Sequence, residues 1–183
     1  MAGLVESLTQ QLTHRMSDPS ILVILTAVTS SSFWLFASLG ITLDGVIPAT
    51  ITASERAKRG ISDASALKLW EWMFHRAKKH FISTALLSCA SYLVAAALRP
   101  DLRPILYGAS FFSFSTLPYT IAILLPINKV ILKAASDASK PDAKSPESGV
   151  VDKLFCEWRK YHVIRMSLAA AAWGLGMGAL LLA

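Results

Sequence analysis

Four long runs of apolar residues, separated by polar connectors, dominate the pattern of this 183-residue chain. Each run is close to the roughly 20 residues that a helix needs to cross the hydrocarbon core of a bilayer. The runs cover residues 21–42, 81–98, 105–126 and 163–183. A soluble amphipathic helix carries a polar face along its length, which these runs lack. The pattern therefore predicts an all-α integral membrane protein, a four-helix bundle that forms one domain over residues 1–183.

The segments next to the first two runs also have helical features. Residues 1–19 carry apolar side chains at helical spacing, which predicts a short N-terminal interfacial helix, with a partner-docking helix as the alternative. No basic segment precedes the first run, and that run exceeds the length of a signal-peptide core, so we expect a retained span. Ser62 and Asp63 can cap a helix that continues through Trp70 into the second span.

The later connectors differ in length and character. Arg99-Pro100 ends the second helix, and the short turn that follows makes spans two and three antiparallel neighbours. Pro118 lies inside span three and predicts a kink there. Residues 136–150 are polar and contain two prolines, which predicts a flexible loop.

Composition and charge agree with a membrane protein and add an orientation. The chain is 54% hydrophobic and 16% charged, fewer charges than in a typical soluble domain. Of the 18 Lys and Arg residues, fifteen lie in or beside the two long connectors. The positive-inside rule therefore places these connectors in the cytoplasm and both termini in the lumen or outside the cell. The net charge of +6 is therefore explained by the basic connectors and not by nucleic-acid binding, for which the sequence contains no motif.

Small residues recur every four positions in the last span, at Ala170, Gly174 and Gly178. Such spacing lets another helix approach closely. Packing within the bundle is the expectation from this pattern, and a homodimer through the same residues is the alternative. The two cysteines, Cys89 and Cys156, lie too far apart in the predicted topology to form a disulfide or a metal site.

Polar and aromatic residues gather at the cytoplasmic ends of spans two, three and four. Trp158, His162 and Arg165 are spaced i, i+4 and i+7, so a helix brings them onto one stripe. Together they can hold a flat, acidic aromatic molecule: the indole stacks on it, the guanidinium attracts an oxyanion and the imidazole accepts a proton. The alternative is that the Trp and Arg are interfacial anchors and the His is solvated. Asn128 and His75 lie near the same depth.

A metal or haem held through His75 and His162 is a further alternative. No HExxH, CxxC or nucleotide-binding loop is present in the sequence. His75 and His80 lie about 140° apart around a helix, so they cannot both bind one ion without distortion.

Three segments resemble the fungal anthrone oxygenases and the wider multipass family that contains them. They are the segment from Trp70 to Lys78, the pair Leu117-Pro-Tyr-Thr and Leu125-Pro-Ile-Asn, and the segment from Trp158 to Arg165. Their order and spacing and the four-span layout are similar over nearly the whole chain.

The resemblance implies a membrane-bound monooxygenase of aromatic polyketide biosynthesis, a secondary-metabolite pathway. It would oxidise an anthrone-type substrate to an anthraquinone with O2 as co-substrate and without a cofactor. By this resemblance His162 is the base, with His75 in reserve, and Arg165 and Asn128 stabilise an oxyanion. The expected substrate-binding residues are Trp158, Trp70, Tyr119 and Tyr161. The resemblance also implies the endoplasmic reticulum as the membrane. A non-enzymatic scaffold or carrier for a lipophilic metabolite is the alternative from another class.

Overall fold

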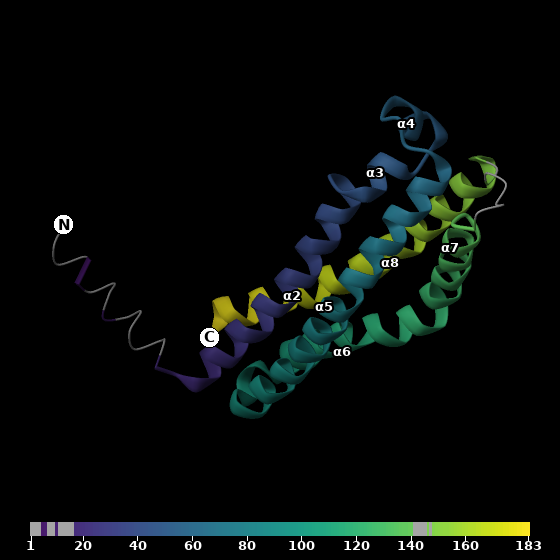
Figure 1. The fold of residues 1–183 in the computed structure, drawn as a ribbon. Coiled ribbons are helices and arrows are strands. Elements are labelled where there is room, and N and C mark those ends of the chain that lie inside the picture. The colour runs from purple at the N-terminus through teal and green to yellow at the C-terminus, as the bar shows by residue number, and fades with distance from the viewer. Residues whose placement is uncertain (1–4, 7–9, 11–16, 141–145, 147) are drawn as a thin grey trace.

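The structure, a computed structural model, describes residues 5–6, 10, 17–140, 146 and 148–183. These residues form helices and turns with no strand among them, which confirms the predicted all-α class. The long helices are α2 (Pro19–Leu43), α5 (Asp63–Leu98), α6 (Arg103–Tyr119), α7 (Leu125–Asp137) and α8 (Ser148–Leu182) (Figure 1). Shorter elements connect them: α3 (Val46–Thr50), α4 (Ala53–Lys58), the 3₁₀ helix η1 (Pro100–Leu102) and the π-helix η2 (Thr120–Leu124).

Four helical stretches of the described chain are long and apolar enough to cross a bilayer. They are Pro19–Thr50, Asp63–Leu98, Pro100–Asp137 and Gly149–Leu182. They contain the four predicted runs, apart from residue 183 at the end of the last one, which confirms that the chain is a multi-pass membrane protein. The helices are longer than the runs: α5 begins at Asp63, not at residue 81, because its polar first half continues the same helix outside the apolar segment. Which side of the membrane holds the basic connectors stays a prediction.

Side-chain caps account for where α2 and α5 begin. Asp18 Oδ1 accepts a hydrogen bond from the Ser20 amide at 2.8 Å, and Pro19 occupies the first turn. The hydrogen bonds from Ser20 lower the pKa of the Asp18 carboxyl, because they favour its charged form. Ser62 Oγ accepts from the Ser65 amide at 3.1 Å, as predicted for the start of α5.

The long helices form a ring in which neighbours along the chain lie side by side. Both α2 and α6 pack against α5 and α8, and η1 connects α5 directly to its neighbour α6. The predicted interfacial helix at residues 1–19 lies mostly outside the described residues. Residues 141–145 and 147 of the predicted loop at 136–150 also lie outside the described residues, and α7 and α8 extend into that loop at either end.

The third span changes direction where its sequence predicts a kink. Pro118 ends the regular part of α6, and η2 follows it at once before the chain returns to α-helix in α7. Proline lacks an amide hydrogen and crowds the preceding turn, and a π-helical turn is a recognised way of accommodating such a defect. Figure 1 shows α7 turned away from the direction of α6.

At Gly176, α8 packs closely against Tyr92 of α5. Tyr92 of α5 is fully buried, its hydroxyl lies 3.1 Å from Ser31 Oγ, and it donates to the Ala172 carbonyl at 3.3 Å. A Cβ on Gly176 would overlap the Tyr92 ring and hydroxyl. Gly176 is therefore the position where glycine permits the two helices to approach.

The predicted role of the Ala170, Gly174 and Gly178 stripe in bundle packing is wrong. Ala170 and Gly174 are exposed, and a Cβ on Gly174 or Gly178 would meet no atom within 4 Å. The helical period of 3.6 residues explains the outcome, since the face that contains Gly176 points inward and this stripe points outward. The homodimer through this stripe stays a prediction.

Gly176→Ala should lower the stability of the folded protein by about 1–3 kcal/mol, the usual cost of an extra methyl in a packed core. Tyr92 cannot move aside easily because its ring is buried and its hydroxyl is hydrogen-bonded. Thermal unfolding in detergent measures the effect. Gly174→Ala is the matched control on the same helix and should be neutral or slightly stabilising, since its Cβ meets open space. Equal behaviour of the two variants would contradict the packing described here.

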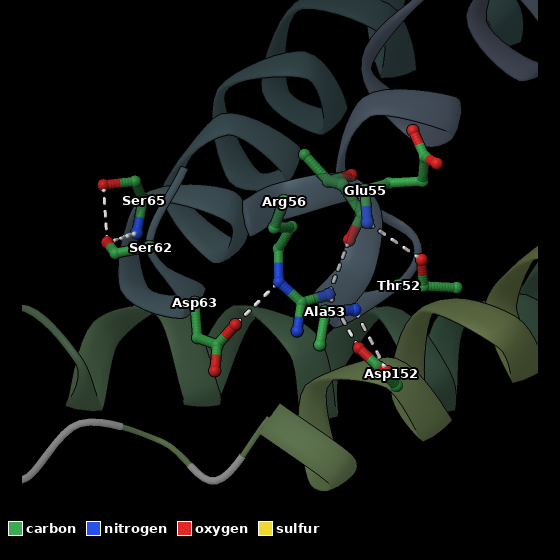
Figure 2. Close-up of polar contacts among 9 residues, drawn as sticks. Thr52, Ala53, Glu55, Arg56, Ser62, Asp63, Ser65 and Asp152 are labelled. Atoms are coloured by element: carbon green, nitrogen blue, oxygen red, sulfur yellow. Dashed lines mark hydrogen bonds and ion pairs between the residues drawn. The ribbon is translucent and has the colours of Figure 1, made fainter. Parts of the chain in front are cut away.

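A buried arginine joins the connector after the first span to the starts of two long helices (Figure 2). Arg56 is 1% exposed, and its Nε donates to Asp63 Oδ1 of α5 at 2.6 Å. Its Nη1 donates to the Thr50 carbonyl at 2.8 Å and lies 2.7 Å from Asp152 Oδ1 of α8. Asp152 Oδ2 also accepts from the Ala53 amide at 3.2 Å. This network anchors the starts of α5 and α8, two helices whose later turns line the cavity described next.

Candidate active site

A cavity of about 250 Å³ lies among α2, α5, α8 and the bent third span. Its volume is a little below the roughly 300–1,000 Å³ of sites for drug-sized ligands, which suits a small molecule. Its walls are largely apolar, with polar groups on a few side chains. The lining residues are Trp34, Ile41, Met73, Phe74, Ala77, Lys78, Phe81, Ile82, Thr116, Leu117, Thr120, Ile121, Leu125, Asn128, Trp158, His162 and Arg165.

The predicted stripe on α8 forms one wall of this cavity. The rings of Trp158 and His162 stack with centroids 4.5 Å apart and an angle of 14° between their planes. Trp158 Nε1 donates to Asn128 Oδ1 on α7 at 2.9 Å. Trp158, His162, Arg165 and Asn128 are all buried. The i, i+4, i+7 spacing thus brings the expected groups together, and α7 supplies Asn128 beside them.

Arg165 lies between aromatic rings and polar groups. Its Nη2 hydrogen-bonds His162 Nδ1 at 2.8 Å, and its Nη1 donates to Thr120 Oγ1 at 3.4 Å. The guanidinium carbon is 5.1 Å from the Trp34 ring centroid and 5.7 Å from that of Phe81. Arg165 Nε has no hydrogen-bond partner among the described residues. Three of the five guanidinium N–H groups therefore make no hydrogen bond to the described residues, and the Thr120 contact is long and weak.

The charge of Arg165 has no acidic partner in the described part of the chain. No ion pair there includes this residue, and no Asp or Glu lines the cavity. A guanidinium removed from water costs several kcal/mol unless its charge is compensated. The two ring faces compensate in part, by about 2 kcal/mol or somewhat more for a desolvated pair. A site of this kind favours an anion.

The hydrogen bond from Arg165 defines the protonation of His162. A guanidinium can only donate, so His162 Nδ1 accepts and carries no proton. The imidazole is then neutral with its hydrogen on Nε2. That nitrogen makes no hydrogen bond of normal geometry, although the Ser38 backbone lies near the ring. The nitrogen that could accept a proton is therefore Nδ1, whose lone pair accepts the hydrogen bond from Arg165.

Four of the expected site residues do not line the cavity. Trp70 is fully buried behind it, with its ring stacked on Phe74 and edge-on to Trp158. Tyr119 is partly buried, and its hydroxyl donates to the Tyr161 carbonyl at 3.2 Å. Tyr161 is also partly buried, and His75 is exposed on α5 against the edge of Phe74. These residues surround the site, and their predicted roles in binding and catalysis are untested.

Sequence reasoning missed several residues that complete the cavity. Trp34 of α2 lies under the guanidinium, although the first span carries no polar signal that would mark it. Phe81 was recognisable only as part of an apolar face on α5, together with Trp70 and Phe74. Thr120 follows the predicted kink, and its hydroxyl points to Arg165 because η2 rotates the chain there. Lys78 ends the segment that resembles the family, but nothing in its spacing distinguishes it from the other basic residues of the connector.

Candidate metal ligands do not gather in the described residues. No group of three or more His, Cys, Asp or Glu side chains that could hold an ion occurs among them. His162 lines the cavity and His75 does not. A metal or haem held through these two residues stays an untested alternative.

Fold and site together define a multi-pass membrane protein with a cationic, aromatic-lined cavity in its helical bundle. The comparisons with known proteins narrow this class: residues 70–175 match the family described as anthrone oxygenase. The chain belongs to the anthrone oxygenase family. The matched range contains all the cavity-lining residues except Trp34 and Ile41. No curated protein and no solved structure matches the chain.

Proposed function

We propose that this protein is a membrane-bound monooxygenase of aromatic polyketide metabolism that oxidises an anthrone-type substrate to an anthraquinone with O2. The observation that carries the proposal is Arg165, a buried cation without an acidic partner, beside a neutral His162 in a cavity sized for flat rings. Family membership supports the same reaction class. An endoplasmic-reticulum location with luminal termini belongs to this proposal too.

The reaction begins with loss of a proton from the methylene group of the central ring. The resulting anthrolate is aromatic, and its negative charge lies largely on the oxygen across that ring. The anion passes one electron to O2, and the radical and superoxide combine to form a carbon–oxygen bond. Protonation gives a hydroperoxide. Loss of the second methylene proton and cleavage of the O–O bond give the second carbonyl and water, so anthrone and O2 become anthraquinone and water.

The side chains on α8 can accept the proton and stabilise the negative charge that arise in these reaction steps. Arg165 Nη2 donates to His162 Nδ1 in the structure. A substrate oxygen that takes over this donor frees Nδ1 to accept the methylene proton, so binding of the substrate switches on the base. The guanidinium then stabilises the anthrolate oxygen in a cavity from which water is largely excluded, where such a contact is strong. Asn128 and Trp158 hold the stacked His162 ring in place.

A metal or flavin is not required in this mechanism. The electron that reduces O2 comes from the substrate anion itself, so the protein need only deprotonate, stabilise and position the ring. A site at membrane depth also suits a poorly water-soluble substrate and a gas that dissolves in lipid.

Purified, chelator-treated protein in detergent should convert an anthrone to its anthraquinone with consumption of one O2 per product. With ¹⁸O2, one labelled oxygen should enter the quinone and the other should leave as water. Quinone formation by absorbance, oxygen consumption by electrode and mass spectrometry measure these results. Micelles without protein correct for spontaneous autoxidation.

Three other results would exclude the cofactor-free oxygenase. Turnover that returns only when a metal is added would favour a metal enzyme. Tight anthrone binding without product would favour a carrier. An absence of both anthrone binding and turnover would favour a non-enzymatic scaffold.

A further inference from the structure

The cavity opens at the outer surface of the bundle, between α5 and η2. Of its lining residues, Lys78, Ile82 and Ile121 are exposed, and they come from these two elements. The η2 segment packs against α6, α7 and α8, whereas α5 packs against α6 and α7 on either side of it. The π-helical detour after Pro118 therefore leaves a gap in the wall of the bundle at this height.

This mouth extends from the apolar surface of the spans toward the basic connectors. Exposed apolar residues continue along both elements, with Leu86 following Ile82 on α5 and Phe114 preceding Ile121 on the third span. On the other side Lys78 lies one helical turn before Ile82, next to Lys79. The mouth thus has a lipid-facing part and a cationic rim.

Lys78 places a second positive charge in a cavity that already contains Arg165. Phe81 marks the level of Arg165 on α5, and Lys78 lies three residues away, about 4.5 Å along the helix axis. Lys78 forms no ion pair with the described residues, and its Nζ is 5.8 Å from the Phe74 ring centroid. No acidic side chain of the described chain lines the space between the two cations. A ligand with one acidic group leaves one of them without a counter-charge.

We propose that Lys78 forms a second anion subsite at the mouth, so that the ligand is a flat aromatic acid with two separate acidic oxygens. Its ring oxygen meets Arg165, and a carboxylate or phenolate substituent meets Lys78 at the rim. The inference rests on the proposed function for the nature of the ring system, and it adds the acidic substituent as the feature that this protein selects. An ordinary role of Lys78 as an anchor to lipid phosphates predicts no such selection.

Binding of two matched anthraquinones tests the subsite without any need for turnover. 4,5-Dihydroxyanthraquinone-2-carboxylate carries acidic ring hydroxyls and the acidic substituent, and 1,8-dihydroxy-3-(hydroxymethyl)anthraquinone has the same shape and ring hydroxyls without the carboxylate. Lys78→Met should weaken binding of the carboxylate about tenfold or more, as expected for loss of a charge-assisted hydrogen bond, and change the neutral ligand less than twofold. Lys78→Arg should restore most of the preference.

Lys79→Met is the matched control, because Lys79 is exposed on the same turn and does not line the cavity. It should leave both affinities unchanged. Equal weakening of the carboxylate by both variants would point to surface charge alone and overturn the subsite. Equal weakening of both ligands by Lys78→Met would overturn it too. If Lys78 discriminates between the ligands and no anthrone is oxidised, the subsite stands and the proposed reaction fails.

Discussion

Arg165→Met should lower kcat/KM for anthrone oxidation by about 100- to 1,000-fold, the effect of removing one oxyanion donor from an active site. Methionine keeps much of the length of the side chain and can pack between Trp34 and Phe81, but it cannot donate to an oxygen anion. Initial rates of quinone formation measure the loss.

The same substitution should not destabilise the protein. Removing a buried charge that has no acidic partner removes a desolvation cost of several kcal/mol, which offsets the lost contacts with His162 and the two rings. The midpoint of thermal unfolding in detergent should therefore stay the same or rise. A drop in activity that simply follows a large drop in stability would argue for a structural Arg165.

Arg159→Met is the control for the general effect of losing a positive charge from α8. Arg159 is exposed and does not line the cavity, so its loss should leave the rate within about twofold of the wild type. Comparable losses in the two variants would mean that net charge, not the local oxyanion contact, sets the rate.

His162→Ala should reduce kcat by about 100- to 10,000-fold, the range that a positioned general base contributes. The anthrone affinity should change much less, because Trp158, Arg165 and the apolar walls remain. The loss should shrink as the pH of the assay rises, since hydroxide then removes the methylene proton in place of the imidazole. Rate measurements across pH, with substrate binding determined separately, distinguish these effects.

His75→Ala tests the alternative that His75 is the general base, with the same measurement of kcat. His75 is exposed and lies outside the cavity, so this variant should retain nearly full activity at every pH. An inactive His75→Ala beside an active His162→Ala would reverse the two roles and show that α5 rearranges when substrate binds.

Local regularity made part of the candidate site predictable. Trp158, His162 and Arg165 repeat with the helical period, so any helix over these residues places them on one stripe. Pro118 marked the bend of the third span for an equally local reason, since proline cannot continue the hydrogen-bond pattern of a helix. Asn128 was expected near this stripe because it lies at the same membrane depth at the end of span three, and its role as an oxyanion stabiliser came from the resemblance to the family.

Other predictions depended on which faces of neighbouring helices pack against each other. The small-residue stripe of α8 was expected to pack inward, yet Gly174 faces outward and Gly176 meets Tyr92. Both sets of positions are equally regular along the helix. Only the rotation of α8 relative to α5 decides between them, and that rotation results from the packing of all four spans.

The sequence by itself determined the four spans, because each apolar run buries its backbone polar groups in its own helical hydrogen bonds. It also determined the order of Trp158, His162 and Arg165 along one face of α8. The tertiary structure alone decided that Trp34 and Phe81 enclose the guanidinium, that His75 lies outside and that the cavity opens beside Lys78. Helix formation depends on neighbours within a few residues, whereas a cavity depends on contacts between residues that are far apart in the chain.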